Sequence, residues 1–142
     1  MSRVFSDVDI ERVAHGLIER TLPKSEWTHA AHFAAALWLL RRRGALALID
    51  MPPLIRAYNE ATGTVNSDTS GYHETITLAS LRAAAAWLAA RPEHSLHSVL
   101  NELLDSPYGR SDWLLRYFSK DLLFSSAARR SWADPDLQPL PF

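Results

Sequence analysis

The stretch WTHAAHFAAALWLL, residues 27–40, decides the fold, together with a second stretch of the same kind, GYHETITLASLRAAAAWL, residues 71–88. Each begins with polar residues that include histidine and then becomes apolar on nearly every face of a helix. Helices with that pattern lie in the centre of a helical domain and not on its surface. We therefore expect these two stretches to form the central helices.

Apolar residues three and four positions apart predict further helices on both sides of the central pair. The expected helices span residues 7–21, 26–43, 50–63, 72–90, 92–104 and 120–132. The end of the chain, residues 134–142, holds three prolines and is expected to be an extended tail, docked by Leu137, Leu140 and Phe142. No strand-like alternation occurs. The sequence predicts one all-α domain over residues 1–142, with a four-helix up-down-up-down core, one or two additional helices and the extended tail.

Capping residues mark several helix ends. Ser6 or Asp7 is expected to cap the first helix, Ser25 the second, and Asp50 the third. Gly44 follows the basic run Arg41–Arg43 and suits the residue that ends the second helix. Ser119 is expected to cap the last helix.

Composition limits the possible functions. The chain has 142 residues, 47% of them hydrophobic and 22% charged, with a formal net charge of −1, so it can bury a core and has no general attraction to nucleic acid or anionic membranes. It contains no cysteine, which excludes disulfides, thiolate metal ligands and a cysteine nucleophile. The first nine residues do not have the pattern of a secretory signal, and the longest apolar run, residues 30–40, is too short to span a membrane. We expect a cytoplasmic protein.

Three histidines are expected to converge at one end of the bundle. Short connections favour antiparallel neighbours, so the second and fourth helices should point the same way. His29 and His32 lie in the first two turns of one, and His73 lies in the first turn of the other. Neutral imidazole is a common ligand of zinc, iron and nickel, and three protein ligands leave a position open for water or substrate. The pattern predicts a divalent metal bound by His29, His32 and His73.

Two neighbouring residues give this site candidate catalytic groups. Glu74 is the candidate proton acceptor from metal-bound water, and Tyr72 is the candidate orienting donor. Glu74 and His73 point about 100° apart on an ideal helix, so only an irregular helix start would let both reach one ion. The leading hypothesis is a metal-dependent hydrolase or group transferase of unknown substrate.

Two other hypotheses stay open. The first is a metal-free pocket in which the two helix N-termini bind a small anionic metabolite. The second is a buried network of imidazoles bonded to tyrosine, threonine or asparagine, in a structural module whose five tryptophans and apolar tail serve a homodimer surface. The candidate ligand-binding residues are Thr28, Tyr58, Asn59, Thr75 and Thr77. A second H-x-x-H pair, at residues 94–97, is expected to be solvated.

The motifs also carry a resemblance. The His-x-x-His of residues 29–32, followed by Tyr-His-Glu-Thr-Ile-Thr at residues 72–77, resembles a group of small helical bacterial proteins with His-x-x-His and Tyr-His-Glu-Thr-x-Thr motifs. The similar part runs from about Glu26 to Trp87. No activity is established for that group, so the resemblance implies a shared site and no particular reaction.

Overall fold

The computed structural model describes residues 4–142, and these residues form helices and connecting segments without any strand. The α-helices are α1 Asp7–Glu19, α2 His29–Arg43, α3 Ala47–Ala61, α4 Glu74–Ala89, α5 Leu96–Asp105, α6 Lys120–Leu123 and α7 Ser126–Arg130. The all-α prediction is confirmed. Within the described part of the chain, no helix has the length and apolarity needed to cross a membrane.

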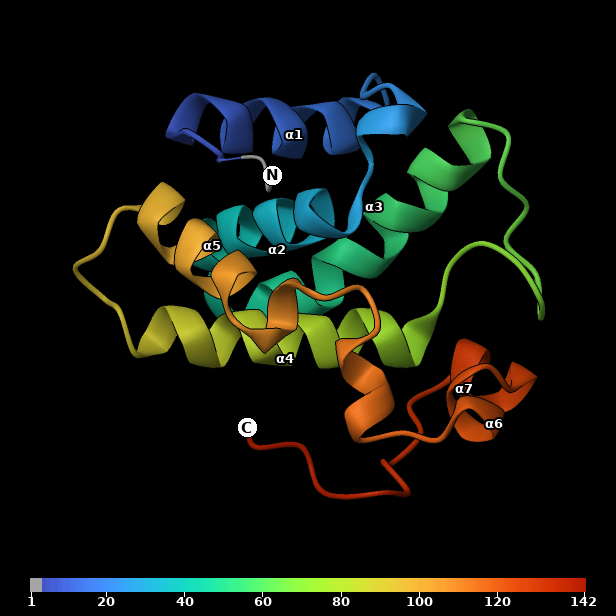
Figure 1. Cartoon of the computed structure of the whole chain (residues 1–142). Helices are drawn as coiled ribbons and strands as arrows, with labels where there is room; N and C mark the ends of the chain where they lie inside the picture. The colour runs from blue at the N-terminus through green and yellow to red at the C-terminus, as the bar shows by residue number, and fades with distance from the viewer. Residues whose placement is uncertain (1–3) are drawn as a thin grey trace.

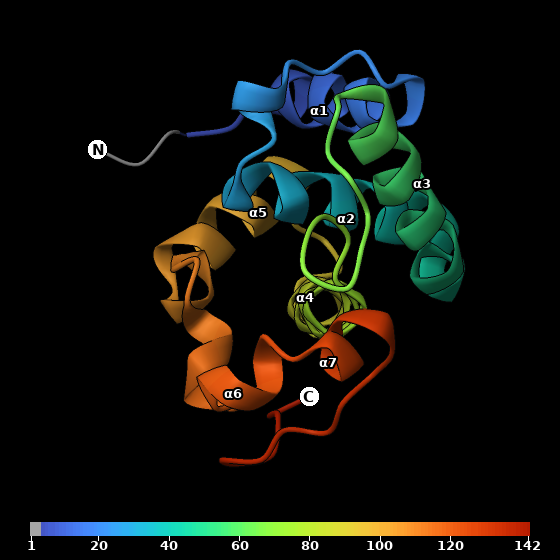
Figure 2. The same cartoon turned by 90° about the vertical axis from the view of Figure 1, so that its right-hand side faces the viewer.

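Helix α2 is the centre of the fold, as its apolar circumference predicts. It packs against α1, α3, α4 and α5, and most of its side chains from Ala31 to Leu40 are buried (Figure 2). Figure 1 shows that α2 and α4 both begin at the right-hand side of the view and run to the left. Their N-terminal halves therefore lie beside each other, which is compatible with the predicted up-down-up-down order of the first four helices.

Local capping chemistry explains several helix ends. Ser6 caps α1: its hydroxyl accepts from the Asp9 N–H at 3.1 Å, and its own N–H donates to the Asp9 carboxylate at 2.9 Å. Ser119 caps α6 through its hydroxyl alone, which accepts from the Leu122 N–H at 3.2 Å. Gly44 ends α2 with a φ of +57°, a value that favours glycine.

The predicted start of α2 is wrong by three residues. Ser25 lies in a short 3₁₀ turn, Lys24–Glu26, and Thr28 is the N-cap, accepting from the Ala31 N–H at 3.2 Å. Between them, Trp27 leaves the helical conformation, and its ring packs on the His32 ring with centroids 3.9 Å apart. Serine and threonine are both good caps. The choice of Thr28 goes with this contact and with a tertiary one, in which the ring centroids of Trp27 and Tyr58 of α3 lie 5.4 Å apart.

Three further boundaries differ from the predictions. Helix α3 begins at Ala47, so Asp50 is inside it and pairs with the Arg43 guanidinium at 2.6 Å instead of capping. Helix α5 begins at Leu96 and not at residue 92. The helix expected over residues 120–132 is two short helices, because the chain breaks at Phe124 and Ser125 starts α7 as a new N-cap.

The C-terminal segment after α7 is extended, as its prolines predict. Leu140 and Phe142 are partly buried against the core. Leu137 is 57% exposed, so its predicted docking is wrong, although its backbone N–H donates to the Tyr117 carbonyl at 2.9 Å.

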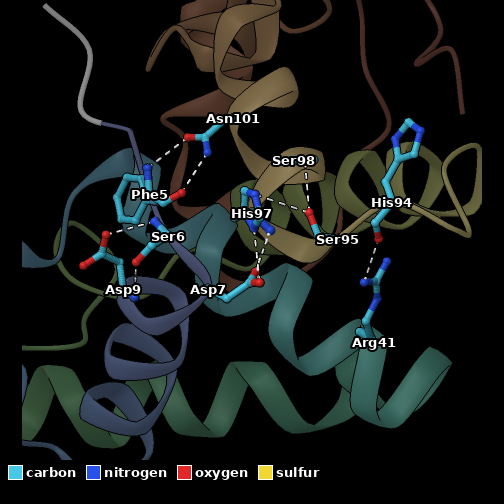
Figure 3. A network of polar contacts seen from close by, with 10 residues as sticks. All are labelled: Phe5, Ser6, Asp7, Asp9, Arg41, His94, Ser95, His97, Ser98 and Asn101. Atoms are coloured by element: carbon cyan, nitrogen blue, oxygen red, sulfur yellow. Dashed lines mark hydrogen bonds and ion pairs between the residues drawn. The ribbon is translucent and has the colours of Figure 1, made fainter.

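The segment before α1 is held against α5 (Figure 3). The Asn101 amide bonds to both backbone groups of Phe5: its Oδ1 accepts from the Phe5 N–H at 3.0 Å and its Nδ2 donates to the Phe5 carbonyl at 2.8 Å. The Asp7 carboxylate accepts from the His97 N–H at 2.9 Å and lies 3.1 Å from the His97 ring. The hydrogen bond with the His97 side chain is the main cause of a lowered pKa of Asp7. His94 is exposed, and the His97 side chain is 45% exposed, as expected for a solvated pair.

We predict that Asn101→Ala lowers the free energy of unfolding by about 1–2 kcal/mol, because two partly buried hydrogen bonds to the backbone of Phe5 are lost. Urea denaturation measures the change. The control is His94→Ala at the exposed turn before α5, which should stay within about 0.5 kcal/mol of the wild type. Equal stability of Asn101→Ala and the wild type would contradict a fixed N-terminal segment.

Candidate functional site

A cavity of about 340 Å³ lies between the N-terminal halves of α2 and α4, with α3 and the loop before α4 completing its wall. Its surface is mostly apolar, with polar and basic side chains at a few places. The lining residues are Lys24, Trp27, His32, Ala36, Met51, Ile55, Asn59, Thr64, Gly71, Tyr72, His73, Ile76, Thr77, Ser80, Leu81 and Arg129. The wall therefore draws on α2, α3, α4, α7, the loop before α4 and the turn before α2.

His32 is the polar group that stands out in this cavity. Its ring is stacked on Trp27, and its imidazole nitrogens have no hydrogen-bond partner among residues 4–142. Burial, reinforced by the nearby His29, lowers the pKa of His32 from 6.5 to about 4. The ring is therefore neutral at pH 7 and offers one N–H donor and one acceptor nitrogen to whatever enters the cavity.

His73 lines the same cavity but has both ring nitrogens occupied. It is the N-cap of α4: Nδ1 accepts from the Ile76 N–H at 3.1 Å. Since Nδ1 accepts, Nε2 carries the proton, and it donates to the Leu123 carbonyl at 2.6 Å. The side chain is buried, and burial is the main cause of its lowered pKa. His73 was predicted inside the first helical turn and lies one residue before it.

His29 faces away from this cavity. Its Nε2 donates to the Tyr108 carbonyl at 2.9 Å, and its ring lines a second cavity of about 160 Å³. His32, Ile76 and Ser80 belong to the walls of both cavities. His32 thus lines the first cavity together with His73 and the second cavity together with His29.

The three histidines as placed do not form the predicted metal site. Across residues 4–142, no three side chains of the histidine, cysteine, aspartate or glutamate type are grouped so as to hold a metal ion. Both His73 nitrogens are committed to backbone groups, and the Nε2 of His29 is committed as well. A zinc, iron or nickel ion at this place would require a different arrangement of these side chains.

Tyr72 and Glu74, the candidate catalytic pair, bind each other. The Tyr72 hydroxyl donates to Glu74 Oε1 at 2.5 Å. Burial and, after it, this bond raise the pKa of Tyr72, so the phenol stays protonated. Tyr72 lines the cavity, whereas Glu74 is absent from its wall.

The other predicted ligand-binding residues fall into two groups. Asn59 and Thr77 line the cavity. Thr28, Tyr58 and Thr75 do not: Thr28 caps α2, the Tyr58 hydroxyl donates to a backbone carbonyl at 2.7 Å, and the Thr75 hydroxyl joins the segment after α7 through bonds of 2.9 and 3.0 Å. The expected imidazole network with these side chains is replaced by bonds from histidines to backbone carbonyls.

Sequence reasoning did not find two basic residues of the cavity. The Lys24 ammonium donates to the Thr64 hydroxyl, and Arg129 Nη1 donates to the Gly71 carbonyl at 2.8 Å. Both belong to segments far from α4 in sequence, and neither is part of a motif. No signal in the sequence marks them as site residues.

Comparison of the chain with protein-family models, curated proteins and solved structures finds no match.

We predict that acid lowers the free energy of unfolding between pH 6.5 and about pH 4. Both His32 and His73 have folded pKa values below 6.5, so the unfolded chain binds these protons first. Their contribution is complete above pH 6.5 and is lost as the pH falls, on the order of 1–3 kcal/mol for His32. Urea denaturation at several pH values measures this slope.

The variant His32→Gln removes one of these groups, and its stability should change less with pH across the same window. The aspartates whose pKa values are lowered from 3.8, such as Asp7 and Asp136, act only in more acidic solution and do not interfere. An unchanged slope in His32→Gln would contradict a partly buried imidazole that the folded protein keeps neutral.

Proposed function

We propose that the protein binds a small organic molecule, without a metal ion, in the cavity between α2, α3 and α4. The observation that carries this proposal is the neutral imidazole of His32, which lacks a partner in the described part of the chain and faces a mostly apolar cavity. The ring nitrogens make no hydrogen bond to the described part of the chain, so a donor and an acceptor are available to a ligand that enters the cavity. The expected ligand combines an apolar body with a group that bonds to His32.

The size and the wall of the cavity support this proposal. A volume of about 340 Å³ lies at the lower end of the range of small-molecule sites, roughly 300–1,000 Å³. Such sites are apolar over most of their surface and hold a few polar groups that orient the ligand. Here Trp27, Met51, Ile55 and Ile76 supply apolar surface beside the His32 imidazole.

The same geometry favours a binding protein over the metal-dependent hydrolase or group transferase. A metal bound through either nitrogen of His73 would take away the N-cap of α4, a loss of about 0.5–2 kcal/mol, and binding through Nε2 would also release the Leu123 carbonyl. Binding of an organic molecule at His32 requires neither change. The metal-free alternative is therefore the function that the site supports best.

We predict that Thr64→Trp weakens the binding of 1-octanol at least about tenfold, as measured by isothermal titration calorimetry. The probe joins a flexible apolar chain to one hydroxyl that can donate to His32. Thr64 is a partly exposed residue of the cavity wall, bonded to Lys24, so an indole at this position fills the entrance. The matched control is Val65→Trp, because its neighbour Val65 is 68% exposed and outside the wall.

Two results would count against the proposal. Equal octanol affinities of the two tryptophan variants would mean that the probe binds elsewhere. Loss of binding when EDTA is present in excess, and its return with zinc, would favour the metal site. We expect EDTA to leave the affinity unchanged.

A further inference from the structure

A second hollow adjoins the ligand cavity on the other side of Tyr72. It has a volume of about 230 Å³ and is lined by Arg56, Asn66, Ser67, Asp68, Tyr72, Arg129 and Arg130. Tyr72 and Arg129 belong to the walls of both spaces. A ligand in the cavity that extends past Tyr72 would therefore reach the arginines.

We propose that this hollow is an anion subsite, which binds the carboxylate or phosphate head group of a molecule whose apolar body occupies the cavity. The inference rests on the proposed function and specifies its ligand as an amphipathic organic anion. Carboxylate and phosphate groups both carry negatively charged oxygens that accept hydrogen bonds from guanidinium groups, so either could be the head group.

The balance of charge in the hollow is positive. Its wall has three arginines and one aspartate, and the aspartate, Asp68, pairs with Arg130 at 3.3 Å. The charges of Arg56 and Arg129 are therefore not neutralised by a carboxylate of the hollow. The whole chain has a formal net charge of −1, so this local excess is a property of the hollow and not of the protein surface in general.

Arg56 has its donors available in a fixed position. Its Cζ lies 4.2 Å from the centroid of the Tyr72 ring, and its guanidinium makes no hydrogen bond or ion pair within residues 4–142. Stacking on an aromatic ring occupies the face of a guanidinium and leaves its N–H groups, which lie in the plane, free to bind an oxyanion.

Arg129 links the hollow to the cavity. A single nitrogen, Nη1, donates to the carbonyls of Gly71 and Tyr72, at 2.8 and 3.4 Å. Guanidinium has five N–H donors, so Nε and Nη2 stay available. Because Arg129 contributes to both walls, a head group bound to it would be next to an apolar body that lies in the cavity.

The test compares three probes with the same chain, 1-octanol, octanoate and octyl phosphate, by isothermal titration calorimetry. We expect at least one anion to bind the wild type about tenfold or more tightly than octanol, the effect of one charge-assisted hydrogen bond. The preference should fall as sodium chloride is added. The ratio of octanoate to octyl phosphate affinity identifies the head group.

Arg56→Gln tests the hollow directly. Arg56 is exposed, so the fold should tolerate glutamine, and the variant should bind octanol as the wild type does while losing most of the preference for the anion. The matched control is Arg110→Gln, since Arg110 is another exposed arginine that pairs with Asp112 outside both spaces. This control should keep the full preference.

The outcomes separate the two proposals. If octanol and both anions bind the wild type equally well, the anion subsite is wrong and the ligand cavity stands. If Arg56→Gln and Arg110→Gln lose the preference equally, the attraction is general and the subsite is also wrong. If none of the three probes binds the wild type, the proposed function itself fails.

Discussion

The two hydrogen bonds of His73 set the start of α4, and the ligand cavity depends on where that helix starts. Nδ1 accepts from Ile76 and Nε2 donates to Leu123, so one ring joins the first turn of α4 to the end of α6. This pairing needs a neutral ring, and burial lowers the pKa of His73 and keeps it neutral. Tyr72, directly before the cap, is held in place as a result. One of the three histidines predicted to bind a metal is thus the cap of a helix.

Small side chains on the facing helices leave the space that the ligand cavity occupies. Ala36 of α2 and Ser80 of α4 are both in its wall, and two larger residues at these positions would fill it. The two helices run in parallel (Figure 1), and His32, Ile76 and Ser80 line the same two cavities. Central helices rich in alanine therefore serve packing along most of their length and leave room for a ligand near their N-termini.

The sequence predicts the helical class and the central position of α2 because burial leaves a clear apolar pattern. It also predicts Ser6, Gly44 and Ser119 as helix ends, since their chemistry is local. The start of α4 was placed too early because imidazole is an unusual cap, and the choice between Ser25 and Thr28 accompanies a tertiary contact. The residues of the site are harder to predict from the sequence. Lys24 and Arg129 lie far from α4 in the sequence, and no local pattern indicates that they line the same cavity as α4.

Asn66 holds together the segments around Tyr72, a residue that lines both the cavity and the arginine hollow. Its Oδ1 accepts from Asn59 Nδ2 at 3.0 Å and from the Tyr72 N–H at 2.9 Å, and its Nδ2 donates to the Arg56 carbonyl at 3.1 Å. One amide thus fixes α3, the loop and the residue that separates the two spaces. A site whose groups are already in position does not spend binding free energy on ordering them. The loop before α4 is polar and has no helical pattern. Through Asn66 it fixes the position of Tyr72 relative to the backbone of Arg56, and Tyr72 lines both spaces.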